Sequence, residues 1–215
     1  MTLIKAVVFD MDGVLLDSET VWDCVWKQYS TVLGLDHVDE ACNACRGCNA
    51  ADQIEILKKI YGSQFDAKKF FEGALELFYE SERKNGIPKK PYAAEILAYL
   101  KQKDYMLALA SSTGRIAVER QLKRVGLLDF FDKTICGDEV KHSKPAPDIY
   151  LIACNAIGVP PQNCVAVEDS PNGIRSAFAA GMNCVMVPDK IACDQEIAKL
   201  LWKKCDSLED LKKFL

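Results

Sequence analysis

The sequence predicts an α/β fold, in which a Rossmann-like parallel sheet is flanked by helices and an all-helical cap domain is inserted after the first strand. Two observations support this prediction. Short apolar runs alternate with helix-like segments over most of the 215 residues, as in a parallel sheet with helices on both faces. Between about residues 17 and 88 this alternation is interrupted, because the patterns there are helical throughout.

Five apolar runs have the length and composition of buried strands. They are Ile4–Phe9, Met106–Ala110, Lys133–Cys136, Cys164–Val167 and Cys184–Val187. Most are separated by helix-like segments, namely Tyr92–Gln102, Arg115–Val125, Pro147–Ile157 and Pro171–Ala180. Together these elements predict a core domain over residues 1–16 and 89–215.

The inserted segment, residues 17–88, carries three helical patterns bounded by glycine and proline breaks. They are Glu19–Leu33, Ala50–Tyr61 and Asp66–Lys84. We expect the two connections to the core, near Leu16–Ser18 and Asn85–Pro91, to act as hinges.

The composition excludes several classes of partner. Hydrophobic residues make up 49% and charged residues 27% of the chain, and the net charge is -4 with no basic block, so we expect no nucleic-acid partner. No apolar stretch approaches the roughly 20 residues that span a bilayer, so we expect no membrane partner. The N-terminal segment lacks the features of a signal peptide, which favours a cytoplasmic location.

The first predicted strand ends in two acids, Asp10 and Asp12, and Gly13 then permits a tight turn. Ligands of open parallel sheets bind beyond the carboxyl ends of the strands. Two carboxylates there can converge on Mg²⁺, which prefers oxygen ligands and commonly binds together with a substrate phosphate. On its own, the motif is equally compatible with a solvated turn.

Two further strand ends carry groups that suit a phosphate. Ser111 and Ser112 follow the second strand, where their hydroxyls and the N–H groups of the next helix can bind phosphate oxygens. Helix capping is the alternative role for such serines. Lys144 follows the third strand, and Pro145 favours an extended conformation at this lysine. A surface lysine is the alternative interpretation of Lys144.

The fourth strand ends in Glu168 and Asp169, just before a serine–proline pair that suits the start of a helix. Capping requires only the serine and leaves the two acids unexplained. Crowded with Asp10 and Asp12 at one sheet edge, they would repel one another unless a cation lies among them. The four acids therefore predict a metal site.

The motifs DMDGVLLDSE, ALASS, SKPAPD and VEDSPNG resemble those of the haloacid dehalogenase-like superfamily, in the helical-cap branch that includes beta-phosphoglucomutase and sugar phosphatases. The resemblance covers nearly the whole chain. It implies a catalytic core at 1–16 and 89–215 and a cap at 17–88 that closes over the active site. It also implies a monomer with Mg²⁺ as cofactor and a small-molecule phosphate ester as substrate.

The resemblance implies a role for each motif. Asp10 would be the nucleophile that forms an aspartyl phosphate, and Asp12 the general acid and then base. Ser111 and Lys144 would hold the phosphoryl group, with Ser112 beside them. The magnesium ligands would be Asp10, the Asp12 backbone carbonyl, Glu168 and Asp169. An intact D-x-D pair favours phosphate chemistry over dehalogenation.

Three cap residues are candidates for substrate binding. Trp22 occupies the position of a histidine that gates catalysis in beta-phosphoglucomutase, although Trp22 is also compatible with a role in the cap core. Arg46 and Gly47 resemble the basic–glycine pair of the mutase, but the arginine that grips its second phosphate is replaced at Ala50.

These departures favour a phosphatase acting on a sugar or polyol phosphate. The alternative is a beta-phosphoglucomutase-like phosphotransferase. A non-enzymatic binding protein is a third hypothesis, which the intact acids and lysine disfavour.

Cys42, Cys45 and Cys48 form a C-x2-C-x2-C run. Iron–sulfur and structural zinc sites resemble it but require a fourth ligand, and position 52 is an aspartate rather than a cysteine. We therefore expect thiols packed in or near a cap helix rather than a metal site.

Overall fold

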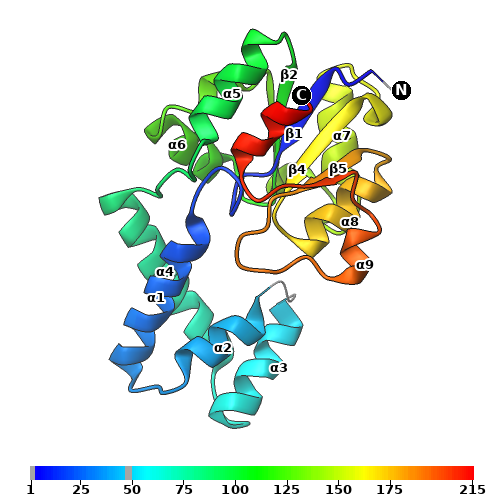
Figure 1. Ribbon diagram of the computed structural model, residues 1–215. Coiled ribbons are helices and arrows are strands. Elements are labelled where there is room, and N and C mark those ends of the chain that lie inside the picture. The colour runs from blue at the N-terminus through cyan, green and yellow to red at the C-terminus, as the bar shows by residue number, and fades with distance from the viewer. Residues whose placement is uncertain (1–2, 47–49) are drawn as a thin grey trace. The chain divides into compact units, whose positions relative to one another are not determined.

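The computed structural model describes residues 3–46 and 50–215. The chain divides into two compact units, one made of Met1–Asp17 with Pro88–Leu215 and the other of Ser18–Ile87. Both units are visible in the ribbon diagram (Figure 1). None of the described helices is both long and apolar enough to cross a membrane.

The first unit is built on a parallel sheet in which the six described strands follow the order β3-β2-β1-β4-β5-β6. The strands are β1 (Ala6–Phe9), β2 (Met106–Ser111), β3 (Lys133–Cys136), β4 (Cys164–Glu168), β5 (Asn183–Met186) and β6 (Lys203–Lys204). The direction of strand addition reverses at β1, and such a switch point is where ligands bind to parallel sheets. The carboxyl ends of β1, β2 and β4 meet there.

Helices cover both faces of this sheet (Figure 1). Helices α7 and α8 pack on one face, and α5 and α6 pack on the other. The helices are α5 (Ala93–Gln102), α6 (Arg115–Arg124), α7 (Asp148–Ala156), α8 (Pro171–Ala179) and α9 (Gln195–Ala198). Short 3-10 segments complete the unit at Leu128–Phe130, Gly137–Glu139, Pro161–Asn163 and Leu208–Lys213.

The α7 face of the sheet is lined by small residues. Val8 of β1 lies opposite Ala108 of β2 and Ala166 of β4, and all three are fully buried. The same buried cluster contains Tyr150 of α7, the largest fully buried side chain described. Small sheet residues leave room for this ring, which brings its hydroxyl to the ligand-binding edge.

The second unit is helical. Its elements are α1 (Ser18–Leu33), α2 (Val38–Cys45), α3 (Ala50–Tyr61) and α4 (Ala67–Asn85). Aromatic rings fill the space between α1 and α4. Trp26 meets Phe70 edge to face at 5.1 Å between ring centroids, and Trp22 stacks on Phe78 at 4.1 Å. Asp66 caps α4 by accepting a hydrogen bond of 3.0 Å from the Lys69 N–H.

The segments by which the chain leaves and re-enters the first unit are hydrogen-bonded to each other. The Asp17 N–H donates to the Pro88 carbonyl at 2.8 Å, and the Lys90 N–H donates to the Leu15 carbonyl at 2.9 Å. The Lys90 ammonium also lies 2.8 Å from Asp189. The connections are therefore tied to the core.

The predicted α/β class with a helical insertion is confirmed, but β6, α2 and the four-residue helix α9 were missed. Strand β6 has only two residues, both exposed lysines, so it carries no apolar signal. Helix α2 contains Cys42 and Cys45. The sequence analysis expected these thiols in or near a cap helix, but it predicted no helix over these residues. The separate roles of core and cap stay a prediction.

Candidate active site

Asp10, Lys144 and Glu168 lie together at the carboxyl edge of the sheet. The Lys144 Nζ donates to Asp10 Oδ1 and to Glu168 Oε1, each at 2.6 Å, and to the Ala110 carbonyl at 2.9 Å. The Lys144 side chain is 8% exposed, and Asp10 and Glu168 are buried. Strand ends β1, β2 and β4 thus fix one ammonium group between two carboxylates.

The backbone around Glu168 is shaped to its carboxylate. Its Oε1 accepts a hydrogen bond of 2.6 Å from the Tyr150 hydroxyl, and its Oε2 accepts one of 3.2 Å from Ser170. Ser170 also caps α8 by accepting from the Gly173 N–H. A Cβ atom at Gly173 would lie 1.9–2.1 Å from the Glu168 carboxyl group, so any larger residue there would require that carboxyl group to move.

Asp169 lies close to Asp10 and Glu168. One carboxylate oxygen from each of these residues lies within 4.8 Å of the others, and this is the one such group of three acid, histidine or cysteine ligands found over residues 3–46 and 50–215. Gly13, with φ of 76°, makes room for it, because a Cβ there would lie 2.3 Å from Asp169 Oδ2. Three hard oxygen donors in this arrangement fit Mg²⁺.

Burial and charge shift the titration of these groups. Burial raises the pKa of Asp10 to about 8, and the Glu168 and Asp12 carboxylates add to this, while the Lys144 ammonium opposes it. Burial would lower the pKa of Lys144, but Asp10 and Glu168 outweigh it and raise that pKa. One ammonium does not compensate four carboxylates, so a divalent cation would relieve the remaining repulsion.

Asp12 is hydrogen-bonded by a hydroxyl from the loop after β2. Thr113 Oγ1 donates to Asp12 Oδ2 at 2.8 Å. The Ser111 Oγ accepts from the Thr113 N–H at 3.1 Å and is fully buried, whereas Ser112 is exposed. The loop after β2 therefore supplies a threonine contact to the D-x-D motif. Neither serine caps α6, because its N-cap residue is Gly114, without a side-chain cap hydrogen bond.

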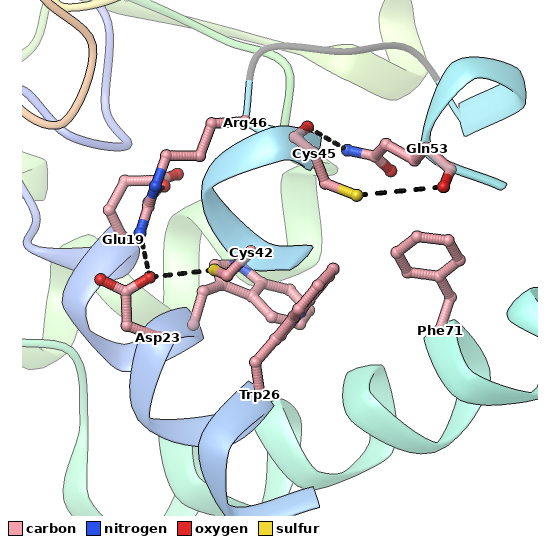
Figure 2. A pocket seen from close by; sticks show the side chains of 9 residues that line it. Glu19, Asp23, Trp26, Cys42, Cys45, Arg46, Gln53 and Phe71 are labelled. Carbon is pink, nitrogen blue, oxygen red and sulfur yellow. Dashed lines mark hydrogen bonds and ion pairs between the residues drawn. The ribbon is translucent and has the colours of Figure 1, made fainter. Parts of the chain in front are cut away.

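The predicted cap residues lie in the second unit. Trp22 and Arg46 line a pocket, in which Arg46 lies beside Glu19 and Asp23 (Figure 2). The Arg46 Nη1 is 3.0 Å from Glu19 Oε2, and its Nη2 donates to Asp23. Gly47 lies outside the described residues.

The described cysteines are free thiols, and several are buried in the sheet core. Cys45 is buried, and Cys42 donates to Asp23 Oδ1 at 3.3 Å. Cys48 lies outside the described residues. Within the described part of the chain, neither Cys42 nor Cys45 belongs to a group of three metal-ligating side chains.

Two residues of the site were not predicted. Thr113 directly follows Ser111 and Ser112 in the sequence, and its position after a strand end could have indicated a polar contact at the sheet edge. Tyr150 occupies a buried helical position, where its hydroxyl requires a partner. The sequence indicates that a buried tyrosine hydroxyl needs a hydrogen-bond partner, but it does not indicate which residue that partner is.

Known proteins resemble this chain in sequence and in fold. A family model described as haloacid dehalogenase-like hydrolase matches residues 7–187. A Phosphorylated carbohydrates phosphatase of Thermotoga maritima is 30% identical over 181 residues, which cover 83% of this chain and 82% of the relative.

Two further matches differ in coverage. Protein SUPPRESSOR OF QUENCHING 1, chloroplastic, of Arabidopsis thaliana is 36% identical over 190 residues, but the match covers 18% of its length. The solved structure of a HAD family hydrolase from Deinococcus radiodurans R1 superposes with a TM-score of 0.82 at 24% identity, covering 98% of this chain and 94% of that one. The latter shows a shared fold.

Proposed function

Because the chain belongs to the haloacid dehalogenase-like hydrolase family, we propose that it hydrolyses a small phosphorylated metabolite through a phosphoryl group carried by Asp10, with magnesium as cofactor. It is a phosphoric monoester hydrolase, in keeping with its phosphatase relatives. A sugar or polyol phosphate is the proposed substrate, since the relative from Thermotoga maritima is named for phosphorylated carbohydrates.

One observation carries the proposal. The Lys144 ammonium lies 2.6 Å from an oxygen of Asp10 and 2.6 Å from an oxygen of Glu168, and Asp169 lies nearby. A buried carboxylate beside a fixed positive charge is suited to nucleophilic attack on phosphorus. Phosphoryl transfer depends mainly on positioning and on charge neutralisation, which this arrangement supplies.

The first step forms a covalent intermediate. A carboxylate oxygen of Asp10 attacks phosphorus, and the bond between phosphorus and the ester oxygen breaks. Asp12 donates a proton to the leaving oxygen as a general acid, so that the organic product departs as an alcohol. Lys144 and the loop at Ser111 hold the phosphoryl oxygens during the transfer.

The second step regenerates the enzyme. Water attacks the phosphorus of the phosphorylated Asp10, and Asp12 now accepts a proton from that water. The bond between phosphorus and Asp10 breaks, and inorganic phosphate leaves. Thr113 positions Asp12 for both proton transfers through its hydrogen bond of 2.8 Å.

Asp10, Glu168 and Asp169 would hold the magnesium ion, together with the backbone carbonyl of Asp12. When bound, the ion would neutralise negative charge on the phosphoryl oxygens and on the ligating carboxylates. Glu168 is kept in place for this task by Tyr150 and Ser170. Such supporting contacts fix the orientation of metal ligands.

A screen of sugar phosphates, polyol phosphates and nucleotides, assayed for phosphate release with and without Mg²⁺, tests the proposal. Release that stops with chelator and returns with Mg²⁺ is the expected result. Conversion of beta-glucose 1-phosphate into glucose 6-phosphate without phosphate release, dependent on glucose 1,6-bisphosphate, would instead identify the phosphotransferase. Equal rates with and without chelator would contradict the magnesium requirement.

A further inference from the structure

Strand β3 forms one edge of the sheet. Within residues 3–46 and 50–215 it pairs with β2 and with no further strand. A free edge presents N–H and carbonyl groups to which a strand of another chain can add, and proteins commonly block such edges. At the opposite edge, the two residues of β6 are both exposed lysines, which is one form of block. Strand β3 has four residues, of which only Lys133 is charged, so its edge requires a different protection.

The register shows which backbone groups of β3 face outward. The Met106 N–H donates to the carbonyl just before β1 at 3.1 Å, so every second residue of β2 from Met106 onward faces β1. The residues between them, including Leu109 and Ser111, face β3. In a parallel pair, the residue opposite one that faces its neighbour turns its own backbone groups away. Thr134 lies opposite Leu109. Cys136 lies opposite Ser111, so both residues of β3 face the free edge.

Two side chains occupy these outward groups. The Arg115 Nη2 donates to the Thr134 carbonyl at 2.8 Å. Glu139 Oε2 accepts from the Cys136 N–H, also at 2.8 Å. The same Nη2 donates to both carboxylate oxygens of Glu139 at 2.7 Å. The Arg115–Glu139 pair therefore forms one bridge along the edge, where the backbone of an added strand would otherwise lie.

Further contacts hold this pair in place. The Arg115 Nη1 donates to Glu119 Oε1 at 3.0 Å and to the Thr134 hydroxyl at 3.1 Å. The backbone N–H of Arg115 donates to Asp138 Oδ1 at 3.1 Å. Most exposed ion pairs lack such support and gain little, because two long side chains must be ordered for a single contact. Here several partners share the ordering of one guanidinium group.

The space beside this edge is open. A hollow of about 510 Å³ borders it, and Arg115, Lys133 and Thr134 are among the residues that line it. The Arg115 and Glu139 side chains are 34% and 37% exposed. Another molecule can therefore reach the edge of β3, and the ion pair is what it would meet there.

We propose that the Arg115–Glu139 pair blocks the free edge of β3 against strand addition by a second copy of this chain. An antiparallel pair of two β3 strands would use the Thr134 carbonyl and the Cys136 N–H of each copy. Those groups already have partners, and pairing would displace a hydrogen-bonded ion pair in both copies. All of these residues belong to the first unit, and the block does not depend on the proposed function.

Sedimentation velocity of an Arg115→Ala and Glu139→Ala double variant tests the block. Strand addition then satisfies backbone groups that the double variant leaves to water, so the dimerisation constant should rise by at least about tenfold over the native protein. The matched control is a Glu196→Ala and Lys199→Ala double variant, which removes an exposed ion pair from α9. The control should sediment as the native protein does.

Amide hydrogen exchange measured by NMR locates the contact. The Thr134 N–H faces the free edge, so an added strand would accept a hydrogen bond from it. Its exchange should slow by at least about tenfold as the concentration of the double variant rises. The exchange of the Val8 N–H, in the central strand β1, should not depend on concentration.

Two results would overturn the proposal. One is a folded double variant that sediments like the native protein at every concentration, and the other is association without slower exchange at Thr134. If the double variant does not fold, the same measurements apply to Glu139→Ala alone. This variant frees the Cys136 N–H and keeps the contacts of Arg115 with Glu119 and Thr134. Phosphate release reports the proposed function separately, and its absence would leave the block standing.

Discussion

Lys144 in the first unit and Arg46 in the second each lie between two carboxylates, and the two arrangements differ in what surrounds them. Lys144 lies between Asp10 and Glu168, with side-chain exposures of 8%, 10% and 1%. Arg46 lies between Glu19 and Asp23, with side-chain exposures of 14%, 34% and 22%. The first trio is buried at the end of a sheet, and the second borders a pocket.

The two trios also differ in what their cations contact. At the sheet edge the Lys144 ammonium donates to the Ala110 carbonyl. Asp169 lies beside Asp10 and Glu168, and the negative charge that Lys144 leaves uncompensated favours a metal ion. In the helical unit the planar guanidinium spreads over three side chains. The compact ammonium of a lysine suits a phosphoryl group, whereas the planar guanidinium of an arginine can orient several hydrogen-bond acceptors at once.

The largest expected effect is at Asp10. Asp10→Asn removes the nucleophile, and turnover should fall by more than about 10³-fold, as when other covalent nucleophiles are lost. The measurement is kcat under saturating Mg²⁺. Asp104→Asn is the control, because Asp104 is exposed and has a φ of 60°, which asparagine also adopts. Substantial activity in Asp10→Asn would break the assignment of chemistry to the sheet edge.

Removing the two cations compares the units directly. Lys144→Met should destabilise the protein by about 3–5 kcal/mol, because it leaves buried carboxylates uncompensated. Arg46→Met should cost less than about 2 kcal/mol, because Glu19 and Asp23 keep contact with water. Urea unfolding of both variants without metal gives the free energies. Equal losses would show that the two trios are buried alike.

Gly173→Ala tests the placement of Glu168 at the sheet edge without changing any charge. A Cβ would collide with the Glu168 carboxyl group, so magnesium affinity should fall by about 10–100-fold, as when supports of metal ligands are removed. Titration calorimetry measures this affinity. Gly34→Ala serves as the control, since a Cβ there meets nothing within 4 Å and only its φ of 66° is strained. Unchanged affinity in Gly173→Ala would contradict a ligand role for Glu168.

Magnesium binding should strengthen as pH rises. Burial raises the pKa of Asp10 from 3.8 to about 8, so between these values the metal-free folded protein binds more protons than the unfolded chain and loses stability as pH rises. Magnesium displaces that proton, and its affinity should rise by up to about tenfold per pH unit below pH 8. Calorimetry between pH 6 and 8 measures this, and a flat profile would count against Asp10 as a ligand.

The smallest effect concerns Thr113. Thr113→Val removes the hydrogen bond to Asp12 while keeping shape, and kcat should fall by about threefold to tenfold through poorer proton transfer. The acidic and basic limbs of the pH–rate profile should move, which a merely structural role would not produce. Thr31→Val, at an exposed site on α1, is the matched control. An unchanged pH–rate profile would contradict the role of Thr113 in positioning Asp12.

Much of the fold could be predicted from the sequence, because the patterns that indicate its strands and helices lie within single segments. Buried strands such as β1 and β4 are continuous apolar runs, and their carboxyl ends must meet in a parallel sheet. The proximity of Asp10, Lys144, Glu168 and Asp169 was expected because the carboxyl ends of parallel strands lie at one edge of the sheet. In contrast, β6 consists of two exposed lysines whose pairing depends only on the backbone of β5.

Several side-chain contacts of the site join residues that are far apart in the sequence, and these contacts could not be predicted from it. Thr113 meets Asp12 across 101 residues, and Arg46 meets Glu19 across 27. No periodicity encodes such pairs, because side-chain partners depend on how elements pack. Arg46, which the sequence predicted to contact substrate, forms ion pairs with two carboxylates in the structure.

Trapping the covalent intermediate tests the central claim most directly. Native protein mixed with a substrate found in the screen and quenched into sodium borohydride should yield homoserine at position 10, because the hydride reduces an aspartyl phosphate. Tandem mass spectrometry of the digested protein locates the change. Homoserine at position 10, absent without substrate, is the predicted result. An active enzyme that gives no reduced residue, or a modification elsewhere, would contradict the role of Asp10.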